Sequence, residues 1–149
     1  IDDGFKFLKN RADMTEDVKF DVIITDLLDP EGPAEEFFRV GFFKLLPSAL
    51  KKDGMVIMQT LENVWLNLKY VVELKQTCCK VFENVEYCQT YMPSFTSGQL
   101  GLLVATHDAN VELKKQPLRE IPTGLKYYLK EIHSASFVLP AWADSEVNY

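Results

Sequence analysis

An apolar run that ends on carboxylates constrains this chain more than any other feature. Residues 20–25 read Phe-Asp-Val-Ile-Ile-Thr, a pattern that predicts a β-strand buried on both faces, as in a parallel sheet. Asp26 and Asp29 follow at once, in a turn rich in proline and glycine. Ligands of open α/β sheets bind beyond the carboxyl ends of strands, so we expect a binding site at this turn.

The rest of the chain predicts helices that alternate with strands. We expect a short helix from residue 5, a polar loop over 10–19, and a helix over 34–51 that breaks near Gly41 and Pro47 and ends at Gly54. A second strand over 55–59, a helix over 64–82, a hairpin of strands 85–91 and 100–106, and a helical segment over 127–139 before a frayed tail complete the pattern. This order predicts the C-terminal half of a Rossmann-like sheet of the class I methyltransferase type, with parallel strands, a terminal antiparallel hairpin and flanking helices.

Composition narrows the class of partner. The chain has 149 residues, 47% of them hydrophobic, which suffices for one globular core. A formal net charge of -6 argues against nucleic acid and favours cationic or neutral small molecules. No run is long enough for a membrane span, and Cys78, Cys79 and Cys88 show neither metal-ligand nor disulfide spacing. We therefore predict a cytoplasmic protein with reduced cysteines and no metal site.

The start of the chain predicts that part of the sheet comes from residues outside this sequence. It begins at Ile1, with no strand before the one at 20–25, although that strand needs a neighbour on each side in a parallel sheet. A bare apolar edge promotes aggregation, so we expect the missing half, a second subunit of a homodimer, or a partner chain to cover it.

An ordered set of short motifs carries a family likeness. The set runs from Asp3-Gly4-Phe5 and the strand with its acidic turn through Gln59, Trp65-Leu66 and Ser97-Gly98-Gln99 to Lys126-Tyr127-Tyr128, His133 and Phe137-Val138-Leu139-Pro140. In this order it resembles the spermidine synthases, which are polyamine aminopropyltransferases. The likeness spans nearly the whole chain, whereas the family's N-terminal β-hairpin domain and glycine-rich nucleotide loop would lie upstream of Ile1, so residues 1–149 would be part of the catalytic domain.

The resemblance implies a reaction and a set of roles. The family transfers an aminopropyl group from decarboxylated S-adenosylmethionine, a co-substrate rather than a prosthetic group, to a diamine such as putrescine, which gives spermidine. By resemblance, Asp26 would be the catalytic acid, and Asp29, Gln59 and Phe95 would bind the diamine. Asp3, Gly4, Leu27 and Pro33 would contact the nucleotide, with 27–33 as the loop that closes over the site.

Departures from the family pattern leave alternatives open. Leu27 and Leu28 stand where two serines are usual, and Phe95 replaces a tyrosine and loses its hydroxyl. A leucine directly after the first acid resembles the pattern in spermine and thermospermine synthases. The resemblance implies a different amine preference. A catalytically degenerate paralogue, acting as a structural or regulatory subunit, is the alternative, and a Rossmann-like methyltransferase shares the sheet. Asp26, Asp29 and Asp3 could also be helix caps, and Gln59 an ordinary strand-end residue.

Overall fold

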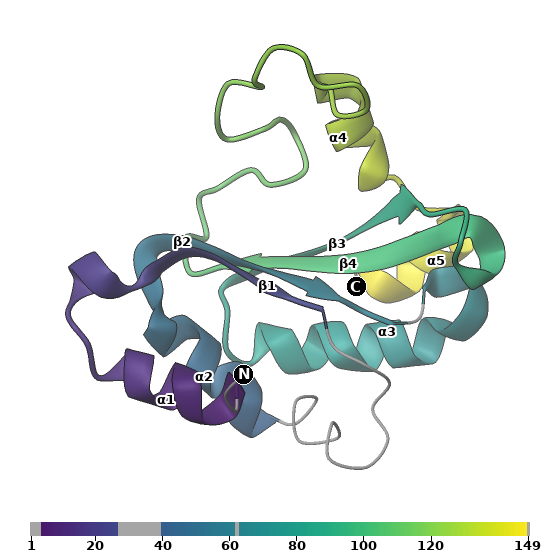
Figure 1. The fold of residues 1–149 in the computed structure, drawn as a ribbon. Coiled ribbons are helices and arrows are strands. Elements are labelled where there is room, and N and C mark those ends of the chain that lie inside the picture. The colour runs from purple at the N-terminus through teal and green to yellow at the C-terminus, as the bar shows by residue number, and fades with distance from the viewer. Residues whose placement is uncertain (1–3, 27–39, 62, 149) are drawn as a thin grey trace.

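A four-stranded mixed sheet organises the chain. The computed structural model describes residues 4–26, 40–61 and 63–148. Strands β1 (Phe20–Thr25), β2 (Leu50–Gln59), β3 (Asn84–Tyr91) and β4 (Gln99–Thr106) lie in the order β1-β2-β4-β3 (Figure 1). β1 and β2 are parallel, whereas β4 is antiparallel to both β2 and β3. The predicted parallel strands with a terminal antiparallel hairpin are confirmed.

The helices occupy both faces of this sheet unequally. Helices α1 (Gly4–Ala12), α2 (Val40–Ala49) and α3 (Val64–Cys79) lie on one face, with α5 (Ala141–Val147) packed on α3. On the other face lie α4 (Lys130–Ser136) and the irregular connector that leads to it from β4 (Figure 1). Short 3₁₀ turns form at Glu16–Val18 and Thr96–Gly98. Within the described ranges, no helix combines the length and the apolar character that crossing a bilayer requires.

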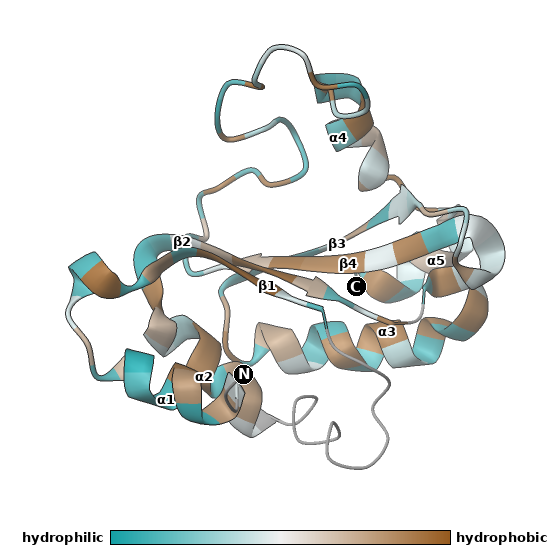
Figure 2. Cartoon of the chain, viewed as in Figure 1, coloured by the Kyte–Doolittle hydropathy of each residue, from teal (hydrophilic) through white to brown (hydrophobic). Residues whose placement is uncertain are grey.

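The core fills the space between the sheet and α1 to α3. Figure 2 shows apolar residues concentrated in the strands and on α2. Met58 and Leu103 face each other across β2 and β4 and are almost wholly buried. Phe43 and Leu46 of α2 and Val71 of α3 are wholly buried in the same cluster. This face of the sheet therefore holds the elements of the site in place.

The other face of β1 is open, contrary to the prediction that the strand is buried on both sides. Within the described chain β1 is an edge strand with β2 as its one neighbour. Ile23 and Thr25 point toward the core, whereas Val22 and Ile24 are 46% and 70% exposed. Alternation along a strand sends successive side chains to opposite faces, and here only one face is covered.

The junction of α2 and β2 also differs from the prediction. α2 continues past Gly41 and Pro47 and ends at Ala49, and β2 starts at Leu50 instead of after Gly54. Pairing with β1 explains the early start: Leu50 pairs with Phe20, and the register then shifts so that Met55 pairs with Val22. At the shift, a Cβ on Gly54 would lie 2.9 Å from the Lys51 carbonyl oxygen, so the strand requires glycine there.

Two further segments are more ordered than the sequence predicted. The loop expected over 10–19 contains the end of α1 and the 3₁₀ turn, because the Arg11 guanidinium stacks on Phe7 and Phe20 and donates to the Val18 carbonyl at 3.2 Å. The tail expected to fray after Pro140 forms α5, in which Ala143 and Val147 are buried. Conversely, the helix predicted over 127–139 is shorter in the structure, where α4 runs from Lys130 to Ser136.

Candidate functional site

Asp26 and Gln59 come to the same edge of the sheet. Thr25 and Met58 are paired residues on the parallel strands β1 and β2, and Asp26 and Gln59 are the next residue on each. Thr25 and Met58 point into the core, so alternation turns Gln59 toward the opposite face, where Ile24 is exposed. Asp26 is itself exposed. A carboxylate and an amide thus stand at the carboxyl ends of two neighbouring parallel strands.

The loop that carries Phe95 belongs to the same edge. β4 is antiparallel to β2, so β4 starts where β2 ends, and residues 92–98 connect β3 to that start. The loop is a tight turn: the Phe95 amide donates to the Met92 carbonyl, and the Gly98 amide to the Phe95 carbonyl, both at 2.9 Å. Phe95 is half-buried. Its ring is present at this edge and carries no hydroxyl group.

Asn63 ties that loop to the end of β2, a role that the sequence pattern did not predict. Its side-chain nitrogen donates to Ser97 Oγ and to the Gln99 carbonyl, each at 2.9 Å. Its side-chain oxygen caps α3 by accepting from the Trp65 amide at 3.0 Å. Asn63 is almost completely buried. An asparagine two residues before Trp65, at the start of a predicted helix, was the available signal.

A hollow of about 340 Å³ lies beside Asp26. Gly4, at the start of α1, and Asp26 both line it, together with Phe7 and residues 22–25 along the edge of β1 that is unpaired in the described chain. The hydroxyl of Thr25 is buried next to Asp26 and has no hydrogen-bond partner among the described residues. The structure therefore brings Gly4, predicted to contact the nucleotide, and Asp26, predicted to be catalytic, to one concave surface.

Four predicted site residues are not placed. Asp3, Leu27, Asp29 and Pro33 lie outside the described residues, as does Leu28. The described part of the site consists of Gly4, Asp26, Gln59 and Phe95. Asp26 and Gly4 line the same hollow. Asp26 and Gln59 are neighbours because each follows one member of the pair Thr25 and Met58.

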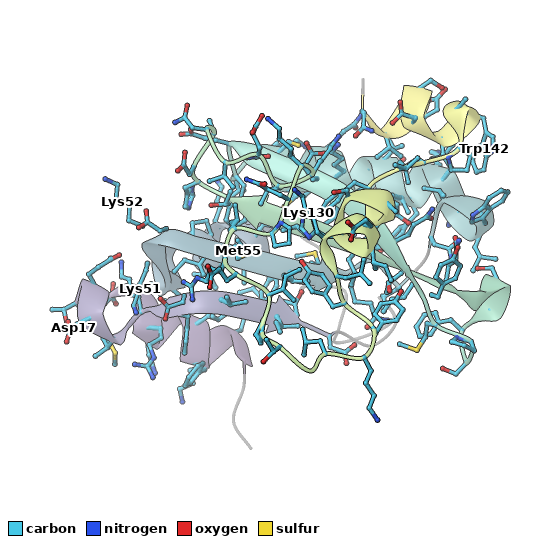
Figure 3. The ribbon with its side chains drawn as sticks, turned by 90° about the horizontal axis from the view of Figure 1, so that it is seen from above. Asp17, Lys51, Lys52, Met55, Lys130 and Trp142 are labelled. Atoms are coloured by element: carbon cyan, nitrogen blue, oxygen red, sulfur yellow. The ribbon has the colours of Figure 1, made fainter. Side chains whose placement is uncertain are left out.

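Formal charges gather at the other end of the strands. Lys51 Nζ forms an ion pair with Asp21 at 3.0 Å, and the hydrogen bond from this ammonium lowers the pKa of Asp21 below its usual range. Figure 3 shows Lys51, Lys52 and Asp17 at the end of the sheet opposite Trp142. The Lys51 ammonium thus neutralises Asp21, at the start of β1, whereas Asp26 lies at its end.

The described residues contain no cluster of three or more His, Cys, Asp or Glu side chains that could hold a metal ion. His133 is engaged instead in structural hydrogen bonds. A carbonyl only accepts, so His133 Nε2 donates to the Leu113 carbonyl at 2.8 Å, and in the neutral ring Nδ1 accepts from the Tyr128 hydroxyl at 2.7 Å. The three cysteines are free thiols.

This arrangement suits chemistry on a cationic or amine ligand. A carboxylate at the mouth of a largely apolar hollow can hold an ammonium group and can take its proton as the group becomes a nucleophile. An amide beside it can fix the orientation of the same nitrogen. The site shows a single described carboxylate, Asp26, and two adjacent groups of different chemistry, Gln59 and Phe95.

Comparison with known proteins identifies a family of similar sequences. Residues 1–115 match the family model described as the spermine/spermidine synthase domain. The chain is 54% identical over 149 residues to the spermine synthase SPE4 of Saccharomyces cerevisiae, covering 98% of this chain and 50% of that protein. It is 42% identical over 153 residues to a spermidine synthase of Schizosaccharomyces pombe, covering 99% of this chain and 49% of that protein. The chain thus spans about half the length of these curated relatives.

Solved structures show the same similarity. A spermidine synthase in complex with the transition-state analogue AdoDATO superposes with a TM-score of 0.78 at 26% identity, covering 99% of this chain and 50% of that one. The spermidine synthase of Thermotoga maritima gives a TM-score of 0.70 at 25% identity, covering 95% of this chain and 47% of that one. The chain therefore corresponds to about half of a Rossmann-like protein of this kind.

Proposed function

The chain belongs to the spermine/spermidine synthase family, and we propose that the full-length protein transfers an aminopropyl group from decarboxylated S-adenosylmethionine to a polyamine acceptor. One observation carries the proposal: Asp26 stands beside Gln59 at the carboxyl edge of β1 and β2 and lines the hollow that Gly4 also lines. That placement gives the acceptor amine a carboxylate next to a cavity for a second substrate.

The reaction asks two things of this carboxylate. The amine nitrogen must be free of its proton, and its lone pair must point at the carbon attached to the sulfonium sulfur. As the new carbon–nitrogen bond forms, the carbon–sulfur bond breaks and its electron pair stays on sulfur, which becomes a neutral thioether. Asp26 accepts the proton that the amine loses and holds the nitrogen in line.

The remaining roles follow from the family resemblance. Asp29 binds the acceptor's second ammonium group, and Gln59 and Phe95 flank the acceptor. Asp3 accepts from the adenine amino group, Gly4, Leu27 and Pro33 contact the nucleotide, and residues 27–33 close over both substrates and exclude water. Decarboxylated S-adenosylmethionine is the co-substrate, as the complex of a related spermidine synthase with AdoDATO supports.

Spermidine is the second candidate acceptor, alongside putrescine. The relative with 54% identity is a spermine synthase, whereas the spermidine synthase relative has 42% identity. Leu27 and Leu28 replace serines of the family pattern, and Phe95 replaces a tyrosine, which makes the entrance less polar. A longer acceptor has more methylene groups to bury there, and each buried methylene contributes about 0.8 kcal/mol.

The proposed enzyme works in the cytoplasm and needs more than this chain. In the described chain β1 has an unpaired edge and, at Val22 and Ile24, an exposed apolar face, and an uncovered edge strand of this kind promotes aggregation. Upstream residues of the same protein, a second subunit of a homodimer, or a partner chain cover it in this proposal. Residues 1–149 alone are expected to be inactive, because they span about half the length of the curated relatives.

A direct assay tests the function. The full-length protein is incubated with decarboxylated S-adenosylmethionine and either putrescine or spermidine, and the amines are separated by chromatography. We expect spermidine from the first acceptor or spermine from the second, with one thioether nucleoside per transfer. A catalytically degenerate paralogue would give neither product, and calorimetry would detect no binding of decarboxylated S-adenosylmethionine.

A further inference from the structure

Ser97 occupies a backbone position that favours glycine. The Gly98 amide donates to the Phe95 carbonyl at 2.9 Å, which closes a four-residue turn over residues 95–98. Ser97 is the third residue of this turn, and its φ of 70° and ψ of -4° are values for which glycine is the usual residue there. A side chain in this conformation costs free energy and persists only where its surroundings hold it. We therefore expect the serine side chain to make a contact that offsets this cost.

The contact is with the side chain of Asn63. The Asn63 side-chain nitrogen donates one hydrogen to Ser97 Oγ and the other to the Gln99 carbonyl, each over 2.9 Å. Its side-chain oxygen accepts from the Trp65 amide at 3.0 Å, so three hydrogen bonds fix the orientation of this amide group. Asn63 is only 1% exposed, and a buried amide must find its partners within the protein. Asn63 therefore holds the Ser97 hydroxyl in one place.

The chain before Asn63 is also in a strained conformation. Gln59 ends β2, and the next residue, Thr60, still donates its amide to the Gly101 carbonyl of β4 at 3.0 Å. Leu61 then adopts a φ of 62°. Among the described residues, Leu61 and Ser97 are the non-glycine residues with positive φ. One of them follows Gln59 by two residues, and the other follows Phe95 by two, so a strained turn stands beside each of these site residues. Such conformations cluster at functional sites.

We propose that Asn63 and Ser97 are positioning residues, which hold Phe95 in place relative to Gln59 and thereby set the affinity for the acceptor amine. The inference rests on the function proposed above, in which Gln59 and Phe95 flank the acceptor. The hydrogen bond between Asn63 and Ser97 joins the segment that follows Gln59 to the turn that carries Phe95. Without this bond the two segments move independently. Binding of the acceptor must then order them, which weakens its affinity.

Steady-state kinetics of Ser97→Gly in the full-length protein test the inference. Glycine suits the turn, so this substitution removes the bond to Asn63 without adding backbone strain. We expect the KM for the polyamine acceptor to rise roughly three- to tenfold, the effect of one lost hydrogen bond, while the KM for decarboxylated S-adenosylmethionine stays within about twofold. Asn63→Ser keeps an oxygen that can cap α3 but lacks the amide donors, so it should raise the same KM. A purely structural role would reduce the amount of active enzyme and leave both KM values unchanged, which would overturn the inference.

Ser94→Ala is the matched control, because it removes the hydroxyl of an exposed serine on the other side of Phe95. It should leave both KM values within about twofold of the unmodified enzyme.

Amide hydrogen exchange follows the same contact without any substrate. The Phe95 amide donates to the Met92 carbonyl within the loop, and its protection should fall in Ser97→Gly and in Asn63→Ser. The amide of Val71, buried in α3, should keep its protection in both variants. Unchanged protection of the Phe95 amide would overturn the inference. If the unmodified protein transfers no aminopropyl group, the proposed function fails, and exchange at Phe95 still decides whether Asn63 and Ser97 hold the loop.

Discussion

Asp26 and Gln59 each follow one member of a single registered pair, Thr25 on β1 and Met58 on β2. Their proximity is therefore a consequence of strand register and not of loop conformation. A shift of one residue in β1 would turn Asp26 to the core face and would end the pairing of Ile24 with Ile57. The register of this strand pair accordingly decides whether the candidate site exists.

Gly54 sets that register, and its replacement should be costly. A Cβ there would lie 2.9 Å from the Lys51 carbonyl oxygen and 3.0 Å from that of Phe20, both of them backbone atoms that cannot turn away. We expect Gly54→Ala to lower the free energy of unfolding by about 1 to 3 kcal/mol. Urea denaturation of the full-length protein measures it.

Gly41 provides the matched control for this prediction. It lies inside α2, and a Cβ there would meet no described atom within 4 Å beyond its own stretch of helix, so alanine fits and favours the helix. Gly41→Ala should therefore be neutral or raise the free energy of unfolding by up to about 1 kcal/mol. Equal destabilisation by the two substitutions would refute the steric account of Gly54.

Asn63→Ala should loosen the loop that carries Phe95. The substitution removes the hydrogen bonds to Ser97 and Gln99 and the cap on the Trp65 amide. We expect a loss of about 2 to 4 kcal/mol in the free energy of unfolding, because three hydrogen bonds are lost and each contributes about 0.5 to 1.5 kcal/mol. Asn10→Ala, at an exposed position of α1, is the control and should change stability by less than about 0.5 kcal/mol. Unchanged protection of the Gly98 amide from hydrogen exchange in Asn63→Ala would contradict this role.

The cysteines should differ in reactivity. Burial raises the pKa of Cys78 to about 12 and that of Cys88 to about 11, and both side chains are buried. Burial also raises the pKa of Cys79, but the nearby Lys75 ammonium opposes the shift and the residue is exposed. Only the thiolate reacts with iodoacetamide, so a raised pKa lowers the reactive fraction at a pH of about 8.

We therefore expect Cys79 to be alkylated first in the folded protein, with Cys78 and Cys88 modified only as it unfolds. Mass spectrometry of the labelled peptides measures the three rates, and the unfolded protein in guanidinium supplies the reference in which the rates converge. Alkylation of Cys78 at the rate of Cys79 under native conditions would show that the end of α3 is less well packed than described.

Periodicity predicted most of the fold, because it reports which face of an element is buried. The alternation of Val85 to Tyr91 and the helical spacing from Val64 yielded β3 and α3 nearly at their observed bounds. The errors share a physical cause: they depend on contacts distant in sequence. Leu50 joins β2 because Phe20 pairs with it, and the segment after Pro140 is helical because Ala143 and Val147 pack against α3.

The candidate site was predictable to the extent that its residues end strands. Asp26 and Gln59 both terminate apolar runs, so their shared edge follows from the parallel pairing of those runs. Asn63 was missed because its importance lies in where its amide reaches: Ser97 and Gln99 are 34 and 36 residues away along the chain. No local pattern encodes such a contact.

The transfer rate of Asp26→Asn in the full-length protein tests the central claim most directly. Asparagine keeps the size of the side chain but cannot accept the proton of the attacking amine. We expect turnover to fall roughly 10²- to 10⁴-fold with the polyamine acceptor, the range typical of a lost general base. Asp53→Asn, an exposed acid at the other end of β2, should leave turnover within about twofold of the unmodified enzyme. Unchanged turnover in Asp26→Asn would contradict the assignment of this carboxylate as the catalytic group.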